Sequence, residues 1–292
     1  MYSYKKSLKS NFSDELINTY LIRPIAGFIV WAIYYTPITP NQVTLASIGS
    51  GLIASYLYYK GSPGEIFIAG LLVTLKDVLD SADGQLARVK NQYSRVGRFL
   101  DSIGDFIVNA ALFSAIGWSL FRMTNQFLLL IAATIGFLCV SLRVSYHVFY
   151  QVNFLHLTDQ YNVNRVSEIV QKEDVNKGGL ELALQRIFQV MYGWQDRLIA
   201  RIDRWSGRES LTYDMNVDDK IVQQWYSDRF GLRFSSMIGL ATELFLLMIC
   251  SLLNRLEWYL VLNLCFMNGI FLLCVFYRRF ILLKILQNTR RG

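Results

Sequence analysis

Residues 80–105 read DSADGQLARVKNQYSRVGRFLDSIGD, and they lie between and inside two stretches that are apolar enough to sit in a bilayer. The segment contains four aspartates: Asp80, Asp83, Asp101 and Asp105. A charged side chain near the centre of a bilayer costs at least roughly 2.5 to 3.5 kcal/mol on insertion scales. Four carboxylates without a partner would argue against insertion of these helices. The sequence therefore predicts a cation that meets them.

Helical geometry brings the four carboxylates together. At about 100° per residue, Asp80 and Asp83 are neighbours on one helix face, whereas Asp101 and Asp105 stack at i and i+4 on another. Two adjacent antiparallel helices would place all four in one cluster. Such a cluster offers hard oxygen ligands, which suit Mg²⁺ or Mn²⁺ and match zinc or copper poorly.

Small residues accompany the aspartates on both helices. Gly84 and Ala87 share the face of the first aspartate pair, and Gly97 and Gly104 lie close to the second pair, which favours close approach of the two backbones. Arg88 adds a fixed cation with planar donors that suit a phosphate. A divalent metal beside an arginine indicates phosphate chemistry.

Together these residues form DxxDGxxAR, followed after eight residues by GxxxDxxxD. This pattern resembles the signature of the CDP-alcohol phosphotransferase family, and every signature position is filled: Asp80, Asp83, Gly84, Ala87, Arg88, Gly97, Asp101 and Asp105. Upstream, the segment TPNQVT at 39–44 is similar to the TPNxVT segment that opens the first span in this family, and Arg23-Pro24 precedes it. The resemblance covers residues 12 to about 150.

The resemblance implies a membrane enzyme that transfers a phosphatidyl group from a CDP-alcohol, typically CDP-diacylglycerol, to an acceptor hydroxyl and releases CMP. It implies two ions of Mg²⁺ or Mn²⁺, held by the four aspartates, and a base role for Asp105. The implied donor contacts are Asn41, Gln42, Thr44, Gly84, Arg88 and Ser94. The Arg-Pro pair and TPNQVT look most like the inositol-phosphate branch, whereas Phe106 departs from that branch, so another polar alcohol stays open.

Composition agrees with a membrane protein. The chain has 292 residues, of which 53% are hydrophobic and 14% aromatic. Six candidate spans lie at about 42–59, 66–88, 97–121, 126–150, 233–253 and 256–277. We predict an all-α integral membrane protein, a bundle of six transmembrane helices with an N-terminal interfacial amphipathic helix over 14–36 that is broken or kinked at Pro24. The predicted division is 1–41, 42–151, 152–232 and 233–292.

Basic residues predict the orientation. The short loops on one side of the six spans hold Lys60, Arg122 and Arg255, whereas the other side holds most of the remaining lysines and arginines. The positive-inside rule then places both termini and the aspartates towards the cytoplasm, in a cytoplasmic membrane or in a eukaryotic endomembrane. The net charge of +7 indicates orientation and attraction to anionic membrane lipids. The basic residues are scattered, and no nucleic-acid-binding motif is present, so nucleic acid is not a predicted partner.

Several polar residues allow two interpretations. Arg143 is a candidate to hold a phosphate on the acceptor, or to form an ion pair between helices or reach the interface. Lys76, one turn before Asp80, is a candidate to neutralise a carboxylate. Glu243 has no evident partner and is predicted to contact another helix or to lie in a homodimer. The polar segment 152–232 either forms an interfacial helix or a small helical cap on the bundle, and it is also a candidate to shape the acceptor site.

Two other classes of protein compete with the transferase. A membrane prenyltransferase also binds a diphosphate through aspartates and Mg²⁺, but it lacks the DG and AR elements seen at 83–84 and 87–88. A non-catalytic scaffold or a cation transporter would not need Arg88. An inactive relative would be expected to lack one of the aspartates, and none is missing here.

Overall fold

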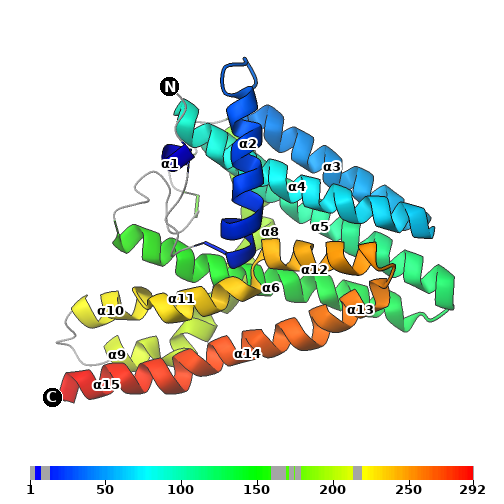
Figure 1. Cartoon of the computed structure of the whole chain (residues 1–292). Helices are drawn as coiled ribbons and strands as arrows, with labels where there is room; N and C mark the ends of the chain where they lie inside the picture. The colour runs from blue at the N-terminus through cyan, green and yellow to red at the C-terminus, as the bar shows by residue number, and fades with distance from the viewer. Residues whose placement is uncertain are drawn as a thin grey trace.

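The computed structural model describes residues 4–7, 14–158, 169–170, 174, 179–212 and 219–291, and every regular element in these residues is a helix. Four long helices run back and forth at the centre of the chain (Figure 1): α3 (Pro40–Lys60), α4 (Pro63–Lys90), α5 (Arg95–Thr124) and α6 (Leu128–Leu157). The all-α prediction is thus confirmed over the described ranges.

Local sequence determines where these helices begin. Thr39 and Ser62 accept hydrogen bonds from the backbone of Gln42 and Glu65, whose side chains bond back to the capping residues. A proline follows each cap in the first turn, where its missing N–H costs nothing. The helices are followed by residues in the left-handed conformation: Gly61, Asn91 and Asn125.

Small residues allow α3, α4 and α5 to pack closely. A side chain at Gly51 would overlap Val108 of α5, and one at Gly104 would overlap Ile48 of α3. Between α3 and α4, the Ser47 hydroxyl donates to the Lys76 carbonyl over 2.9 Å. Small side chains and hydroxyl groups are typical of helix contacts inside a membrane, because they let backbones approach.

The C-terminal part returns along the bundle. A first run comprises α10 (Asp219–Tyr226), α11 (Arg229–Ser235), the 3₁₀ turn Ser236–Ile238 and α12 (Leu240–Leu252). A second run comprises α13 (Leu256–Val261), α14 (Asn268–Phe276) and α15 (Leu283–Arg291), joined by π-helical turns over Leu262–Met267 and Tyr277–Leu282. Figure 1 shows the second run along one side of the bundle.

The two ends of the bundle differ. The short turns after α3, α5 and α12 lie at one end (Figure 1), where Arg122 donates to the Lys60 carbonyl over 3.0 Å. The α4–α5 connection, α10 and α15 lie towards the other end. The aspartate pattern belongs to this second end, as the alternation of the helices requires.

The segment after α6 packs on the bundle. Its described parts include α8 (Gly179–Asp203), a π-helical turn over Arg204–Arg208 and α9 (Glu209–Thr212). The Asp203 carboxylate is buried and accepts hydrogen bonds from Tyr150 of α6 and from Trp225 and Tyr226 of α10, all within 2.9 Å. Arg278 lies 3.5 Å above the Tyr150 ring. These described helices pack on the bundle as a helical cap would, and the exposed Trp194 and Trp205 leave the interfacial helix as a prediction. Parts of 159–178 and residues 213–218 lie outside the described residues.

Four helical stretches are long and apolar enough to cross a membrane by length and composition: Arg95–Thr124, Leu128–Leu157, Lys220–Leu252 and Leu256–Thr289. Helices also cover the first two predicted spans, as α3 and α4, but neither reaches this standard because α3 is rich in serine and glycine and α4 carries Lys76, Asp77 and Asp80. The molecule therefore has the membrane-capable helices of an integral membrane protein. The count of six spans stays a prediction.

The N-terminal helix is unbroken at Pro24. A π-helical turn over Asn18–Ile22 leads directly into α2 (Arg23–Ile33), and Pro24 occupies the first turn of α2. The outward face of α2 is apolar, with Phe28 and Trp31 more than half exposed, and its buried residues Arg23, Ala26, Gly27 and Val30 lie on the side that packs against α4. The interfacial amphipathic character of this segment stays a prediction.

Candidate active site

Carboxylates of α4 and α5 meet at the cap end of the bundle. Ligand atoms from Asp80, Asp101 and Asp105 all lie within 4.8 Å of one another. Asp83 is buried beside this group, and its Oδ2 accepts a hydrogen bond from the Thr44 hydroxyl. Asp101 Oδ1 is buried and has no hydrogen-bond partner among the described residues. A buried carboxylate oxygen without a donor fits a hard divalent cation, so this donor set suits Mg²⁺ or Mn²⁺.

A lysine inside the bundle also faces the carboxylates. The Lys76 ammonium forms an ion pair with Asp105, and its Nζ lies 3.8 Å from Asp80 Oδ1. Its side chain is only 1% exposed. The prediction that Lys76 neutralises a carboxylate is thus confirmed, with Asp105 as its partner, and the pair also gives the buried lysine the counter-charge that it needs. It also means that the chain itself supplies part of the positive charge that the aspartates require.

Two predicted donor contacts meet at the start of α5. Ser94 caps this helix by accepting a hydrogen bond from the Gly97 backbone over 2.9 Å. A side chain at Gly97 would come within 2.6 Å of Asn41 Oδ1, so glycine is what allows Asn41 of α3 to approach. Both polar side chains are exposed beside a helix N-terminus, where the free backbone donors favour an anion.

The other pair of predicted donor contacts lies on α4. A Cβ atom at Gly84 would lie in ordinary van der Waals contact with the Arg88 guanidinium, at 3.5 Å, so Gly84 and the Arg88 side chain adjoin each other. Arg88 Nε donates to the carbonyl of Ser7 in the short helix α1 (Tyr4–Ser7). Its remaining N–H groups are the ones that a phosphate could use.

Gln42 and Thr44 have local roles that the sequence did not indicate. Gln42 is an exposed partner in the cap of α3, where its Oε1 accepts from the Thr39 backbone over 2.9 Å. The Thr44 hydroxyl is buried and orients Asp83. Thr44 is therefore placed to act on the donor through Asp83, whereas Gln42 stays open to direct contact.

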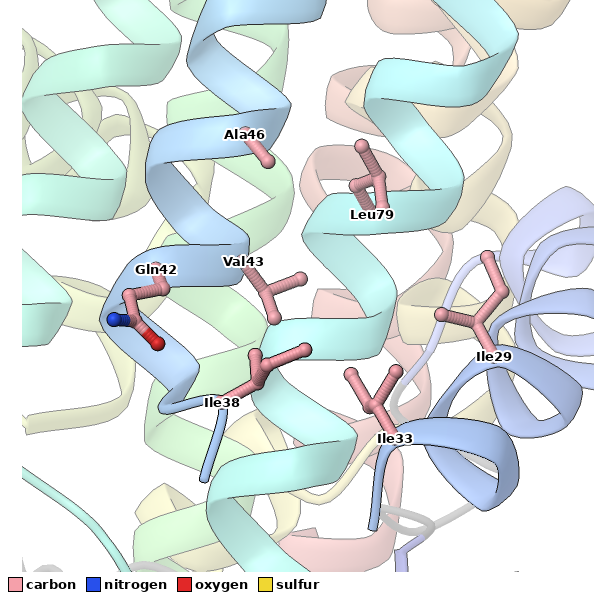
Figure 2. Close-up of a pocket in the computed structure, with 7 residues that line it drawn as sticks. All are labelled: Ile29, Ile33, Ile38, Gln42, Val43, Ala46 and Leu79. Carbon is pink, nitrogen blue, oxygen red and sulfur yellow. The ribbon is translucent and has the colours of Figure 1, made fainter. Parts of the chain in front are cut away.

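An apolar groove lies between α2, α3 and α4. It has a volume of about 470 Å³ and is lined by Ile29, Ile33, Ile38, Gln42, Val43, Ala46 and Leu79. Figure 2 shows side chains from the three helices facing this common space, with Gln42 as its polar member. Leu79, which lines the groove, directly precedes Asp80 on α4. The lining of the groove suits a hydrocarbon chain.

Arg143 lies in a buried network between helices. Its guanidinium pairs with Glu243 of α12 over 2.8 Å and donates to the Asn263 carbonyl and to Asn268 Oδ1 over 2.9 and 2.6 Å. Asn263 donates its side-chain amide to the same Glu243 carboxylate. Of the alternatives for Arg143, the structure shows the inter-helix ion pair. Glu243 thus has a partner within its own chain, and nothing about its position calls for a homodimer.

Comparison with known proteins shows what the region that holds this site is similar to. Residues 37–169 match the sequence profile of the CDP-alcohol phosphatidyltransferase family. The matched region begins before α3 and includes all four aspartates and Arg88.

Curated relatives each match part of the chain. A phosphatidylinositol phosphate synthase of Corynebacterium glutamicum is 31% identical over 43% of this chain and 55% of its own length. An archaetidylinositol phosphate synthase of Pyrococcus horikoshii is 36% identical over 33% of this chain and 50% of its own length. A bifunctional IPC transferase and DIPP synthase of Thermococcus kodakarensis is 29% identical over 36% of this chain and 23% of its own length. The chain spans about half or less of these relatives.

Proposed function

We propose that the protein is a CDP-alcohol phosphatidyltransferase of phospholipid biosynthesis, which transfers the phospho-alcohol of a CDP-linked lipid to an acceptor hydroxyl and releases CMP. The observation that carries the proposal is the carboxylate cluster of Asp80, Asp101 and Asp105 within the matched domain, with Arg88 on the same helix as Asp80. CDP-diacylglycerol is the proposed donor. A prenyltransferase or a scaffold is disfavoured because neither accounts for the family match.

Asp80, Asp83, Asp101 and Asp105 are the proposed ligands of two Mg²⁺ or Mn²⁺ ions. The orphaned Asp101 Oδ1 and the close ligand atoms support this assignment. When bound, such ions supply Lewis-acid polarisation and charge stabilisation on the transferred phosphoryl group. Thr44 holds Asp83 in its orientation, and Lys76 balances Asp105, so the protein presets the positions of two of the four carboxylates.

The donor is bound in two parts. Arg88, Gly84, Asn41 and Ser94 are placed to hold the pyrophosphate and cytidine between the end of α4 and the start of α5. The apolar groove beside Gln42 takes hydrocarbon of the lipid portion, with α2 as its outer wall (Figure 2). This division lets the lipid stay in contact with the membrane while its phosphates reach the carboxylates.

Asp105 is the proposed base. A carboxylate oxygen of Asp105 takes the proton of the acceptor hydroxyl as the acceptor oxygen forms a bond to the phosphorus that carries the lipid alcohol. The bond from this phosphorus to the bridging oxygen breaks, and CMP leaves with the electron pair. Two relatives are named as synthases of a phosphatidylinositol phosphate and an archaetidylinositol phosphate. The proposed acceptor is therefore inositol phosphate or another polar alcohol. Because Arg143 is engaged with Glu243, we propose no acceptor contact for it.

Removal of divalent metal is expected to abolish the reaction. The purified protein, given labelled CDP-diacylglycerol and a panel of polar alcohols, should release CMP with Mg²⁺ or Mn²⁺ and release none in excess EDTA, because carboxylates alone cannot stabilise the phosphoryl charge. As a control, CMP release should return when excess Mg²⁺ is added back, but not when Ca²⁺ is added at the same concentration. This result would show that the chelator removed the metal and did not damage the protein. Full turnover in EDTA would contradict the metal assignment.

The proposed cytoplasmic orientation has its own test. CMP and CDP are cytoplasmic and charged, so the aspartate end must face that side, as the lysine and arginine bias also predicts. In a background without native cysteines, a cysteine at Lys60 should react with an impermeant thiol reagent from outside intact cells, and one at Gln92 should react only after permeabilisation. The two positions lie at opposite ends of the bundle, after α3 and after α4. Labelling of Gln92→Cys in intact cells would reverse the proposed orientation.

A further inference from the structure

The short helix α1 (Tyr4–Ser7) lies against α4, the helix that carries Arg88 (Figure 1). Ser7 is completely buried there, and its carbonyl accepts a hydrogen bond from Arg88 Nε. The Ser7 hydroxyl donates to the Tyr4 carbonyl over 2.6 Å and lies 3.2 Å from Gln85 Oε1. A residue that precedes the matched region, 37–169, therefore contacts the arginine that is proposed to bind the donor.

Gln85 fixes the other side of this contact. Its side chain is completely buried, and its Nε2 donates to the Arg23 carbonyl over 3.1 Å. Because the amide nitrogen is committed to Arg23 at the start of α2, the amide oxygen is turned towards Ser7. Arg23 in turn pairs with Asp14. The N-terminal residues, α2 and α4 are thus joined by one buried polar network that ends at Arg88.

Tyr4 anchors the start of α1 on α2. A Cβ atom at Gly27 would overlap the Tyr4 ring, so the absence of a side chain at Gly27 gives the ring its place. Gly27 is buried in the interior of α2, where glycine is a poorer helix former than alanine. The contact with Tyr4 accounts for a glycine at this position.

The bond to Ser7 holds Arg88 without reducing its charge. A guanidinium carries its N–H donors in one fixed plane, and Ser7 occupies the donor on Nε, so both terminal nitrogens keep the fork that a phosphate accepts. A carbonyl is a neutral acceptor, whereas a carboxylate in its place would compete with the phosphate for the same cation. An arginine that is fixed before the donor arrives also loses less side-chain freedom on binding.

We propose that α1 is a positioning element for the donor site: the Ser7 carbonyl fixes the Arg88 guanidinium for the pyrophosphate of the donor, and Tyr4, in its place beside Gly27, keeps Ser7 there. The inference rests on the proposed transferase function and deepens it. Ser7 and Tyr4 act through Arg88 and not on the reacting atoms. Displacement of α1 is therefore expected to weaken donor binding and to leave the chemical step nearly unchanged.

The first test removes the Tyr4 ring from the full-length protein. CMP release is measured with Mg²⁺ and the best acceptor of the panel of polar alcohols, over a range of mole fractions of CDP-diacylglycerol in mixed micelles. Tyr4→Ala should raise the KM for the donor by roughly three- to tenfold and change kcat by less than about twofold, because ordering one arginine side chain is worth about that factor. Tyr4→Phe keeps the ring and should leave the donor KM unchanged. A lower donor KM in Tyr4→Ala would show that α1 covers the site, and it would overturn the positioning role.

A double-mutant cycle shows whether the effect passes through Arg88. Tyr4→Ala should raise the donor KM in the otherwise unchanged protein and have little further effect in the Arg88→Ala background, because no guanidinium is left to position. A purely structural role of Tyr4 would give the same increase in both backgrounds. Equal increases would therefore overturn the proposal.

Gly27→Ala displaces the ring from the opposite side. The added methyl group meets the Tyr4 ring, whereas alanine strengthens the helix itself, so a weaker donor site would not come from a weaker α2. We expect the donor KM to rise by roughly the same three- to tenfold. Gly49→Ala on α3 is the matched control, since a Cβ atom there meets no described atom within 4 Å, and it should leave the donor KM unchanged. Equal donor KM values in the two alanine variants would contradict the role of Tyr4.

Failure of the inference and failure of the function are distinguishable. Absence of CMP release by the unchanged protein with every acceptor would overturn the transferase function itself. CMP release with a donor KM that neither Tyr4→Ala nor Gly27→Ala changes would overturn the positioning role of α1 alone. Helical circular dichroism and thermal unfolding check that each variant is folded, and Gly27→Ala serves if Tyr4→Ala is not.

Discussion

Replacement of Asp105 by asparagine is expected to lower turnover by roughly 10² to 10⁴ with little change in the KM for the donor. Asparagine keeps the size of the side chain but cannot accept the acceptor's proton, and it weakens the divalent site. The measurement is CMP release at saturating donor and acceptor over a range of Mg²⁺ concentrations. A loss that high Mg²⁺ fully restores would assign Asp105 to metal binding alone. Turnover near that of the unchanged protein would move the base elsewhere.

Two companion variants separate the effects. Arg88→Ala should chiefly raise the KM for the donor, because a phosphate-binding cation acts in the ground state and the transition state alike. Asp105→Asn also breaks the ion pair between Asp105 and Lys76. Lys76→Met breaks the same pair but keeps the Asp105 carboxylate, so it measures what loss of the pair alone does to stability. Thermal unfolding of both variants would show whether the loss of turnover in Asp105→Asn exceeds what weakened folding explains.

Glu243→Ala is expected to destabilise the protein by about 3 to 5 kcal/mol, because it leaves the buried Arg143 charge without its counter-ion. Both side chains are at most 2% exposed. Unfolding in detergent, followed by helical circular dichroism against denaturant, measures the change. Glu257→Ala is the control, since its contact with Arg255 is exposed and such a pair contributes about 1 kcal/mol or less. Equal destabilisation by the two substitutions would contradict the account of Arg143.

Much of the architecture and the core of the site could be predicted from the sequence. The helices over 40–60, 63–90, 95–124 and 128–157 coincide with the apolar stretches predicted at 42–59, 66–88, 97–121 and 126–150. Helical spacing predicted the cluster of Asp80, Asp101 and Asp105, but the expected close approach of the two helices that carry them was wrong. Both α4 and α5 pack against α3, and Gly104 contacts Ile48 of α3 instead of α4. The features that were predicted correctly depend on residues close in sequence.

The form of the N-terminal helix was harder to predict. Pro24 was expected to break or kink it, but the helix continues from the π-helical turn over Asn18–Ile22 into α2 without a break, with Pro24 in the first turn of α2. A proline at that position lacks only an N–H that the first turn of a helix leaves without a partner, so it need not interrupt the chain.

The sequence by itself determined the helices, their caps and the spacing that gathers the aspartates, because each of these depends on neighbours within one or two turns. Only the tertiary structure decided the partners across helices: Lys76 with Asp105, Thr44 with Asp83, Arg143 with Glu243, and Ser7 with Arg88. Those pairings depend on the rotation and crossing of helices that are distant in sequence. The packing of side chains between helices sets this rotation and crossing, which cannot be predicted from the spacing of residues along one helix.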